Sequence, residues 1–67
     1  MGGGIEYGAR VRQRREACGM TVEQLARAVS VTLSRMISIE GGAGLDDVLE
    51  DRIEAALATA ALRVTRS

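Results

Sequence analysis

Arginine is the residue type in this sequence best suited to recognising another molecule. All nine basic residues are arginine, and six of them fall between residues 10 and 35, where only Glu16 and Glu23 are acidic. A guanidinium group is planar and always charged, and it donates paired hydrogen bonds to phosphate groups and to guanine. Residues 36–62 carry six acidic residues against Arg52 alone, so a net charge of zero conceals a basic first part and an acidic second part. The basic part is either a surface for a negatively charged partner or an ordinary set of solvated helix faces.

The sequence contains few residues suited to catalysis or to metal binding. The chain has no histidine, the usual general acid or base at neutral pH, and a single cysteine, Cys18. A lone cysteine excludes an internal disulfide and, without histidine, leaves a zinc site without ligands. We interpret Cys18 as a small core residue. The sequence predicts a protein that is not an enzyme and that uses no cofactor and no metal.

The length of 67 residues allows one domain at most. A domain this small buries only about 60% of the surface that its unfolded chain exposes, so dimerisation or compact helix packing would help to stabilise it. No apolar run is long enough to span a membrane, and the glycine-rich start lacks the apolar segment of a signal peptide. We expect a single cytoplasmic domain over residues 1–67, with a flexible start at residues 1–5 and no membrane association.

Two helices are expected in the first half of the chain. The first runs from about residue 6 to residue 18, and Gly19 ends it in a left-handed conformation. Thr21 and Gln24 have the spacing of a capping box, in which the hydroxyl accepts from the amide three residues on and the glutamine side chain reaches back. They predict the start of a second, short helix that ends near Val29.

The segment 21–40 is typical of a helix-turn-helix. Thr32 is a good N-cap for a third helix from Leu33 to about Glu40, which the glycine-rich residues 41–44 terminate. In a helix-turn-helix the first helix braces across the phosphate backbone and the second lies in the major groove. The two helices must share a small core, for which the candidates are Leu25, Ala26, Val29, Val31, Met36 and Ile39.

A last helix is expected over residues 46–63, with acidic residues at its start where they complement the helix dipole. One apolar stripe on it, suited to the core, consists of Leu49, Ile53, Ala56, Leu57 and Ala60. A thinner second stripe at seven-residue spacing consists of Val48, Ala55 and Leu62. This second stripe is either tolerant surface or the contact with a second copy of the chain.

Residues 7–42, which read YGARVRQRREACGMTVEQLARAVSVTLSRMISIEGG, resemble the family of lambdoid phage repressors, Cro proteins and regulators of the xenobiotic-response-element type. The resemblance covers over half of the chain without insertion or deletion. It implies an all-α, four- to five-helix, lambda-repressor-like domain that contains a helix-turn-helix. The matching positions are Gly8, Arg10, Val11, Arg12 and Arg15, then Gly19, Met20 and Thr21, then Leu25 and Ala26, and finally Ile39, Glu40 and Gly42.

The resemblance also implies roles for individual residues. Arg15 and Glu40 would form an internal salt bridge between the first and third helices. The positions that face DNA from the start and outer side of the recognition helix correspond to Thr32, Leu33, Ser34 and Ser38, with Arg35 beside them. Candidates for phosphate contact are Arg10, Arg12, Arg14 and Arg27, and the alternative for each is solvated helix surface.

Several departures from the family pattern bear on DNA binding. Val22 replaces a glutamine at the start of the second helix, and Leu33 replaces a residue that hydrogen-bonds a base, although Leu33 could pack against a thymine methyl group. Ser30 stands where relatives have a turn glycine, and it can adopt the left-handed conformation at some cost. Ile37 is apolar where relatives are often polar, and residues 41–47 lack the usual basic side chains. These changes open a second hypothesis, in which the same surface binds protein.

The leading functional prediction is a sequence-specific, double-stranded DNA-binding regulator, a dimeric repressor of a phage or mobile-element operon. One domain of this size makes few contacts, so a homodimer on a palindromic operator is expected. The alternatives are an antitoxin-type regulator that also binds a partner protein and a small phage-encoded inhibitor that uses the same fold to bind protein.

Overall fold

The structure is a computed structural model that describes residues 4–66, so the first three residues of the expected flexible start lie outside it. Its regular elements are four helices: α1 (Ile5–Ala17), α2 (Val22–Ala28), α3 (Leu33–Glu40) and α4 (Asp47–Arg66). The predicted all-α class is confirmed. The boundaries differ slightly from expectation, since α1 begins at residue 5 and ends at 17, and α4 continues three residues beyond residue 63.

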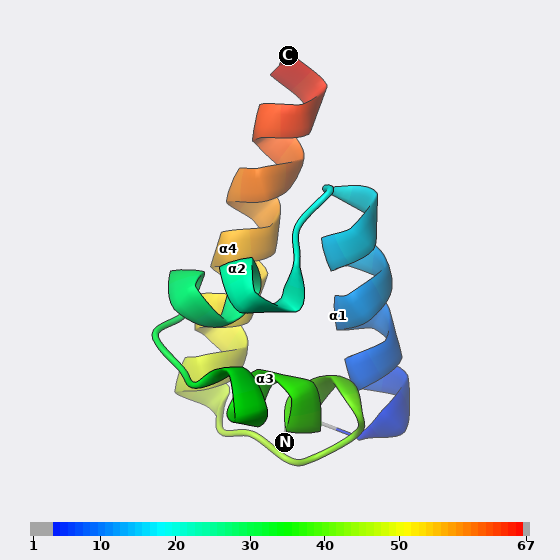
Figure 1. Cartoon of the computed structure of the whole chain (residues 1–67), viewed down its shortest axis with the longest axis vertical. Coiled ribbons are helices and arrows are strands. Elements are labelled where there is room, and N and C mark those ends of the chain that lie inside the picture. Colours follow the sequence, from blue (N-terminus) through cyan, green and yellow to red (C-terminus); the bar gives the residue numbers. More distant parts are fainter. Residues whose placement is uncertain (1–3, 67) are drawn as a thin grey trace.

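The four helices pack around one core in a molecule with extents of 33 × 21 × 18 Å. In Figure 1, α4 runs along the long axis, α1 lies beside it, and α3 crosses the lower end of the molecule. The last turns of α4 extend beyond the other three helices, and Leu62 on these turns is exposed. Within residues 4–66, no helix combines the length and the apolar character needed to cross a membrane.

Local side-chain caps begin three of the helices. The capping box at α2 is complete: Gln24 N–H donates to Thr21 Oγ1 at 3.1 Å, and Thr21 N–H donates to Gln24 Oε1 at 2.8 Å. At α3, the hydroxyl of Thr32 accepts from the Arg35 amide at 3.1 Å. At α4, Asp46 accepts from the Leu49 amide at 2.8 Å. Each cap satisfies an amide that the first turn of a helix leaves without a partner.

Left-handed residues close the two connections that flank α2. Gly19, with a φ of 71°, follows α1, and Ser30, with a φ of 62°, follows α2. A non-glycine residue in this region carries a cost of about 1–2 kcal/mol. Ser30 accepts that strain because the turn between α2 and α3 must be tight for Val31 N–H to donate to the Ala26 carbonyl, at 3.0 Å.

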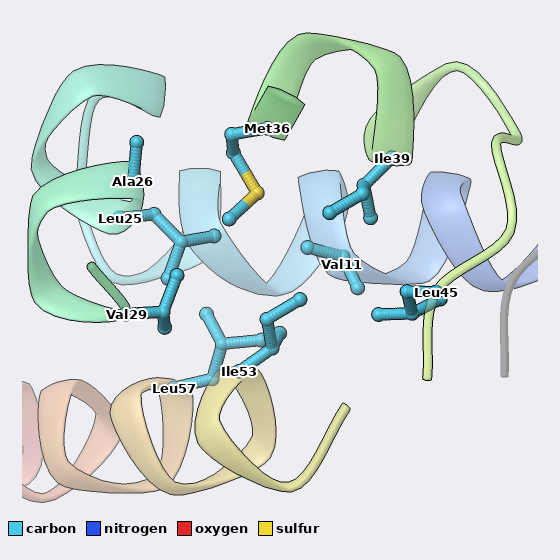
Figure 2. Close-up of a cluster of buried hydrophobic side chains, with 9 residues drawn as sticks. All are labelled: Val11, Leu25, Ala26, Val29, Met36, Ile39, Leu45, Ile53 and Leu57. Atoms are coloured by element: carbon cyan, nitrogen blue, oxygen red, sulfur yellow. The ribbon is translucent and has the colours of Figure 1, made fainter. Parts of the chain in front are cut away.

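Every helix contributes to the hydrophobic core (Figure 2). Of the six residues expected in the core of the helix-turn-helix, five are at most 3% exposed. The sixth, Val31, is partly buried and packs against them. Leu45 was not expected in the core, yet it follows the glycine loop and is buried there. Cys18, expected as a core residue, is only half-buried, because α1 ends just before it. The buried residues are Val11, Leu25, Ala26, Val29, Met36, Ile39, Leu45, Ile53 and Leu57.

Gly8 allows α1 to approach the end of α3 closely. A Cβ atom at this position would lie 2.5 Å from the carbonyl oxygens of both Ile39 and Glu40. These oxygens belong to the backbone, so they cannot move aside as the tip of a flexible side chain would. Only glycine therefore permits the observed packing of α1 against α3.

We expect Gly8→Ala to destabilise the protein by about 1–3 kcal/mol, because the added methyl group forces the two helices apart. Gly44→Ala is the matched control, since a Cβ atom there meets nothing within 4 Å. Thermal unfolding followed by circular dichroism measures both variants. Equal melting temperatures for the two variants would show that α1 and α3 do not pack as described.

Candidate nucleic-acid interface

α3 presents one face to solvent opposite its buried face. Met36 and Ile39 point into the core (Figure 2). Residues at i and i+4 of a helix lie on the same face, about 5–6 Å apart. Two such pairs form an apolar row and, beside it, a hydroxyl row. We call these four exposed residues the outward face of α3: Leu33 and Ile37 in the apolar row, and Ser34 and Ser38 in the hydroxyl row.

A nearly buried ion pair orients α3. Arg15 donates to Glu40 through Nε at 2.8 Å and through Nη2 at 3.1 Å, in a two-point contact. Only 11% of the Arg15 side chain and 9% of the Glu40 side chain are exposed. A third donor, Nη1 of Arg15, reaches the carbonyl of Met20 at 2.8 Å, just before α2. One guanidinium group thus joins the end of α1, the entrance to α2 and the end of α3.

The chemistry of this pair explains its strength. Paired hydrogen bonds between a guanidinium and a carboxylate are charge-assisted and hold both groups in one plane. The hydrogen bond to Glu40 raises the pKa of Arg15, against the opposing effect of burial. The ion pair is therefore a structural element of the site.

Thr32 and Arg35 flank the outward face of α3 but are engaged in local contacts. The Thr32 hydroxyl accepts the N-cap hydrogen bond, which leaves its own proton free to be donated to a phosphate oxygen. The guanidinium of Arg35 donates to the Gly44 carbonyl at 3.2 Å, so it reaches toward the glycine loop. The structure thus places Arg35 beside the serine row, with its charge directed at the loop.

Arg12 and Arg27 lie at opposite ends of the apolar row. Arg12, from α1, lines a shallow hollow together with Val22 and Ile37. Arg27, from α2, lines another hollow together with Val31 and Leu33, which it shares with the carboxylate of Glu23. Arg12 also forms an exposed pair with Glu16 on the same helix, at 3.3 Å, which is worth only about 0.3–0.5 kcal/mol. Both guanidinium groups remain exposed and available to a partner that approaches α3.

Arg10 and Arg14 lie on a different side of α1, against α4. Nη1 of Arg14 donates to Glu54 Oε1 at 2.6 Å, and the Tyr7 hydroxyl donates to Glu54 Oε2 at 3.1 Å. Arg10 lines the same hollow as these residues. Although all four arginines of α1 are near one another in sequence, the structure does not bring Arg10 and Arg14 to the outward face of α3.

The Tyr7–Glu54–Arg14 cluster has fixed protonation at neutral pH. The hydrogen bond from Arg14 holds the pKa of Glu54 below its usual value, with a further contribution from the hydrogen bond that Tyr7 donates. Burial, together with the hydrogen bond to Glu54, raises the pKa of Tyr7 well above its usual value. Glu54 is therefore ionised and Tyr7 protonated, and the cluster holds α1 against α4.

Sequence reasoning did not anticipate this cluster. A weak signal was available, because Tyr7 and Arg14 are seven residues apart and therefore share one side of α1. The partner, Glu54, is 40 residues further along the chain from Arg14, and no local pattern connects the two.

We expect Glu40→Ala to destabilise the protein by about 3–5 kcal/mol, because it leaves the nearly buried Arg15 with only the exposed carboxylate of Glu16, 4.0 Å away, as a counter-charge. Glu16→Ala is the comparison, since it removes an exposed carboxylate that pairs with Arg12 at 3.3 Å and lies 4.0 Å from Arg15, without touching the two-point contact. Urea unfolding of both variants gives the two free energies. A loss for Glu40→Ala no larger than that for Glu16→Ala would mean that the ion pair does not hold α3 in place.

Comparison with known proteins agrees with this geometry. Residues 6–66 match the family described as "Helix-turn-helix domain", which covers α2, the turn, α3 and nearly all of the flanking helices. No curated protein and no solved structure matches the chain. The match extends over most of the sequence, and the function that this family indicates is that of a DNA-binding regulator. The chain belongs to the helix-turn-helix domain family.

Proposed function

We propose that the protein is a sequence-specific regulator that binds double-stranded DNA with α3 in the major groove. The observation that carries the proposal is the outward face of α3. It combines two serine hydroxyl groups with two large apolar side chains, and an exposed guanidinium group lies at each end of the apolar row. In a helix-turn-helix the second helix reads base edges while the surrounding residues contact the backbone.

The two rows of α3 suit different features of DNA. The hydroxyl groups of Ser34 and Ser38 both donate and accept, so they can pair with base edges or with phosphate oxygens. Leu33 and Ile37 cannot form such bonds, and they fit apolar groups on the groove floor. Thr32, at the N-terminus of α3, is placed for a phosphate contact, since helix N-termini and free hydroxyl protons favour anions.

Arg12 and Arg27 are the arginines that we assign to phosphate contacts. Their positions beside Ile37 and Leu33 place them next to α3, so a duplex seated on that helix would bring its backbone to them. Arg10 and Arg14 are the less suitable candidates, because a phosphate would have to compete with Glu54 for Arg14. Arg35 would first have to leave the Gly44 carbonyl.

A homodimer on a palindromic site is part of the proposal. A single module of this size buries little surface on DNA, and two copies on half-sites one helical turn apart would supply the specificity that one lacks. The stripe of Val48, Ala55 and Leu62 is exposed on α4. Ala55 is two positions from the buried Ile53 and Leu57, and Val48 and Leu62 are five positions from the nearer of them, so the stripe lies on the opposite side of the helix. We assign the second copy to this stripe.

Repression of a phage or mobile-element operon, in the cytoplasm, is the regulatory role that we favour. It is supported by the resemblance of residues 7–42 to phage repressors. A dimer of this size on an operator would act by occupying the DNA that polymerase needs, and it requires no further domain for that purpose.

A second candidate is a protein-binding role, as in an antitoxin-type regulator or a small inhibitor. Two of the four side chains on the outward face of α3 are large and apolar, with Leu33 40% and Ile37 55% exposed. The dependence of binding affinity on salt concentration distinguishes the two roles. Phosphate contacts release counterions, so affinity for DNA falls as salt rises, whereas an apolar contact releases none.

Selection from a random pool of DNA duplexes tests the proposal directly, and an enriched palindrome is the expected result. On the selected site, we expect the double variant Ser34→Ala, Ser38→Ala to bind roughly tenfold more weakly, a loss of about 1–2 kcal/mol in hydrogen bonding to base edges. Gln13→Ala, which removes an exposed amide from α1, is the control and should bind as the wild type does. Failure to enrich any sequence, even at low salt, would contradict DNA recognition by this protein.

The assignment of phosphate contacts is tested by salt titration. We expect Arg12→Ala to reduce the slope of log K against log salt concentration by about 1 for each protomer, because one phosphate contact is lost. Arg14→Ala is the matched variant on the same helix, and its slope should equal that of the wild type. A reduced slope for Arg14→Ala with an unchanged slope for Arg12→Ala would place the DNA on the other side of α1.

A further inference from the structure

We infer that the apolar row of α3 reads the C5-methyl groups of pyrimidines in the major groove, with thymine as their source. This inference rests on the proposed function and names the chemical feature of the base that the site recognises. It concerns Leu33 and Ile37, two large apolar side chains that lie outside the buried core and are 40% and 55% exposed.

The first argument is the position of the row. Leu33 and Ile37 are one helical turn apart on the flank of α3 between the buried Met36 and the outward row of Ser34 and Ser38, and both are exposed. A helix that seats its serine row on base edges therefore brings both apolar side chains to the groove floor as well. Neither side chain can form a hydrogen bond, so a polar base edge that faces either of them loses its hydration without compensation, whereas a methyl group does not.

The second argument is the chemistry of the groove. Among the four bases, thymine alone displays a methyl group on the major-groove edge, beside the O4 acceptor. The same methyl group occurs on 5-methylcytosine. A spacing of about 5–6 Å between the two side chains corresponds to fewer than two steps of about 3.4 Å along a DNA strand. The row is therefore matched to two methyl groups that lie within two base pairs of each other.

The third argument is the charge around the row. Arg12 lines the hollow that contains Ile37, and Arg27 lines the one that contains Leu33, so a guanidinium group lies at each end of the apolar row. Glu40, which also borders the first hollow, is paired with Arg15, and the carboxylate of Glu23 borders the second hollow beside Arg27. An apolar centre with an exposed arginine at each end is complementary to a groove floor between two phosphate backbones, which favours DNA over an apolar protein surface as the occupant.

The half-buried Val22 extends the apolar surface toward α2. It lines the hollow of Ile37 and packs against the core. A methyl group that enters this hollow would meet Val22 as well as Ile37, so more of its surface would be removed from water.

Replacement of thymine by deoxyuridine tests the inference, because it removes the methyl group and leaves base pairing and hydrogen-bonding groups intact. On a duplex selected by the wild-type protein, each thymine of one half-site is replaced in turn, and the dissociation constant is measured by fluorescence anisotropy. We expect a loss of about fourfold at each of two positions within two base pairs of each other, which corresponds to about 0.8 kcal/mol for one buried methyl group. The other positions should change little.

Variants of the protein connect each methyl group to a side chain. Leu33→Ala should bind thymine and deoxyuridine equally at one of the two sensitive positions, and Ile37→Ala should do so at the other. Ser34→Ala is the control, which should keep both preferences. Since Leu33 and Ile37 lie outside the buried core, these variants should remain folded, as circular dichroism will verify.

The outcomes separate this inference from the proposed function. Selected sites that bind equally well with thymine and with deoxyuridine at every position, and with cytosine and 5-methylcytosine, would overturn the methyl assignment and retain DNA recognition. A preference confined to 5-methylcytosine, measured with duplexes methylated at selected cytosines, would keep the methyl assignment and replace thymine as its source. The absence of any selected sequence would overturn both.

Discussion

The contact between α1 and α3 is the constraint on which the rest of this molecule depends. α3 is only eight residues long, and a helix of that length is not stable in isolation, so tertiary contacts must hold it in place. Two features of α1 supply the orientation: Gly8 lets the backbones meet near residues 39 and 40, and Arg15 holds the Glu40 carboxylate at two points. Because the third donor of Arg15 reaches the Met20 carbonyl, the same group also positions the entrance to α2. The outward face of α3 can therefore be presented as a rigid surface.

The helical period divides the arginines of α1 between two tasks. Arg12 and Arg15 are three residues apart and share the side toward α2 and α3, whereas Arg10 and Arg14 are four apart and share the side toward α4. Arg15 has a structural role and Arg12 stays exposed beside Ile37. The acidic Glu54 pairs with Arg14, whereas Arg12 and Arg27 remain exposed beside α3. A net charge of zero over the whole chain is thus compatible with a local basic surface.

α4 gives this small domain more core than three short helices could form. Ile53 and Leu57 are almost fully buried beneath the other helices, and the Tyr7–Glu54–Arg14 cluster adds polar contacts at the edge of that core. The opposite side of α4 carries the exposed Val48, Ala55 and Leu62. These side chains face away from the core and add nothing to it.

The sequence by itself determined the helices and their connections, because the signals for them are local. Thr21 with Gln24, Thr32 and Gly19 act within three or four residues of their own positions, and the 3.6-residue period marks Leu25, Met36 and Ile39 as buried. The helix-turn-helix could also be predicted, because its order of N-cap, helix, turn, second N-cap and second helix is contained within residues 21–40.

Only the tertiary structure decided which arginines are free and why Gly8 is required. Arg10, Arg12 and Arg14 are equivalent in a sequence pattern, and their different surroundings come from residues 40 positions away, such as Glu54, that no local period connects to them. The need for glycine at position 8 arises from carbonyl oxygens on α3, and the burial of Leu45 arises from the path of the loop that precedes α4. Helix caps and apolar periodicity depend on neighbours along the chain. Whether an arginine is paired, and whether two helices can approach closely, depends on neighbours in space.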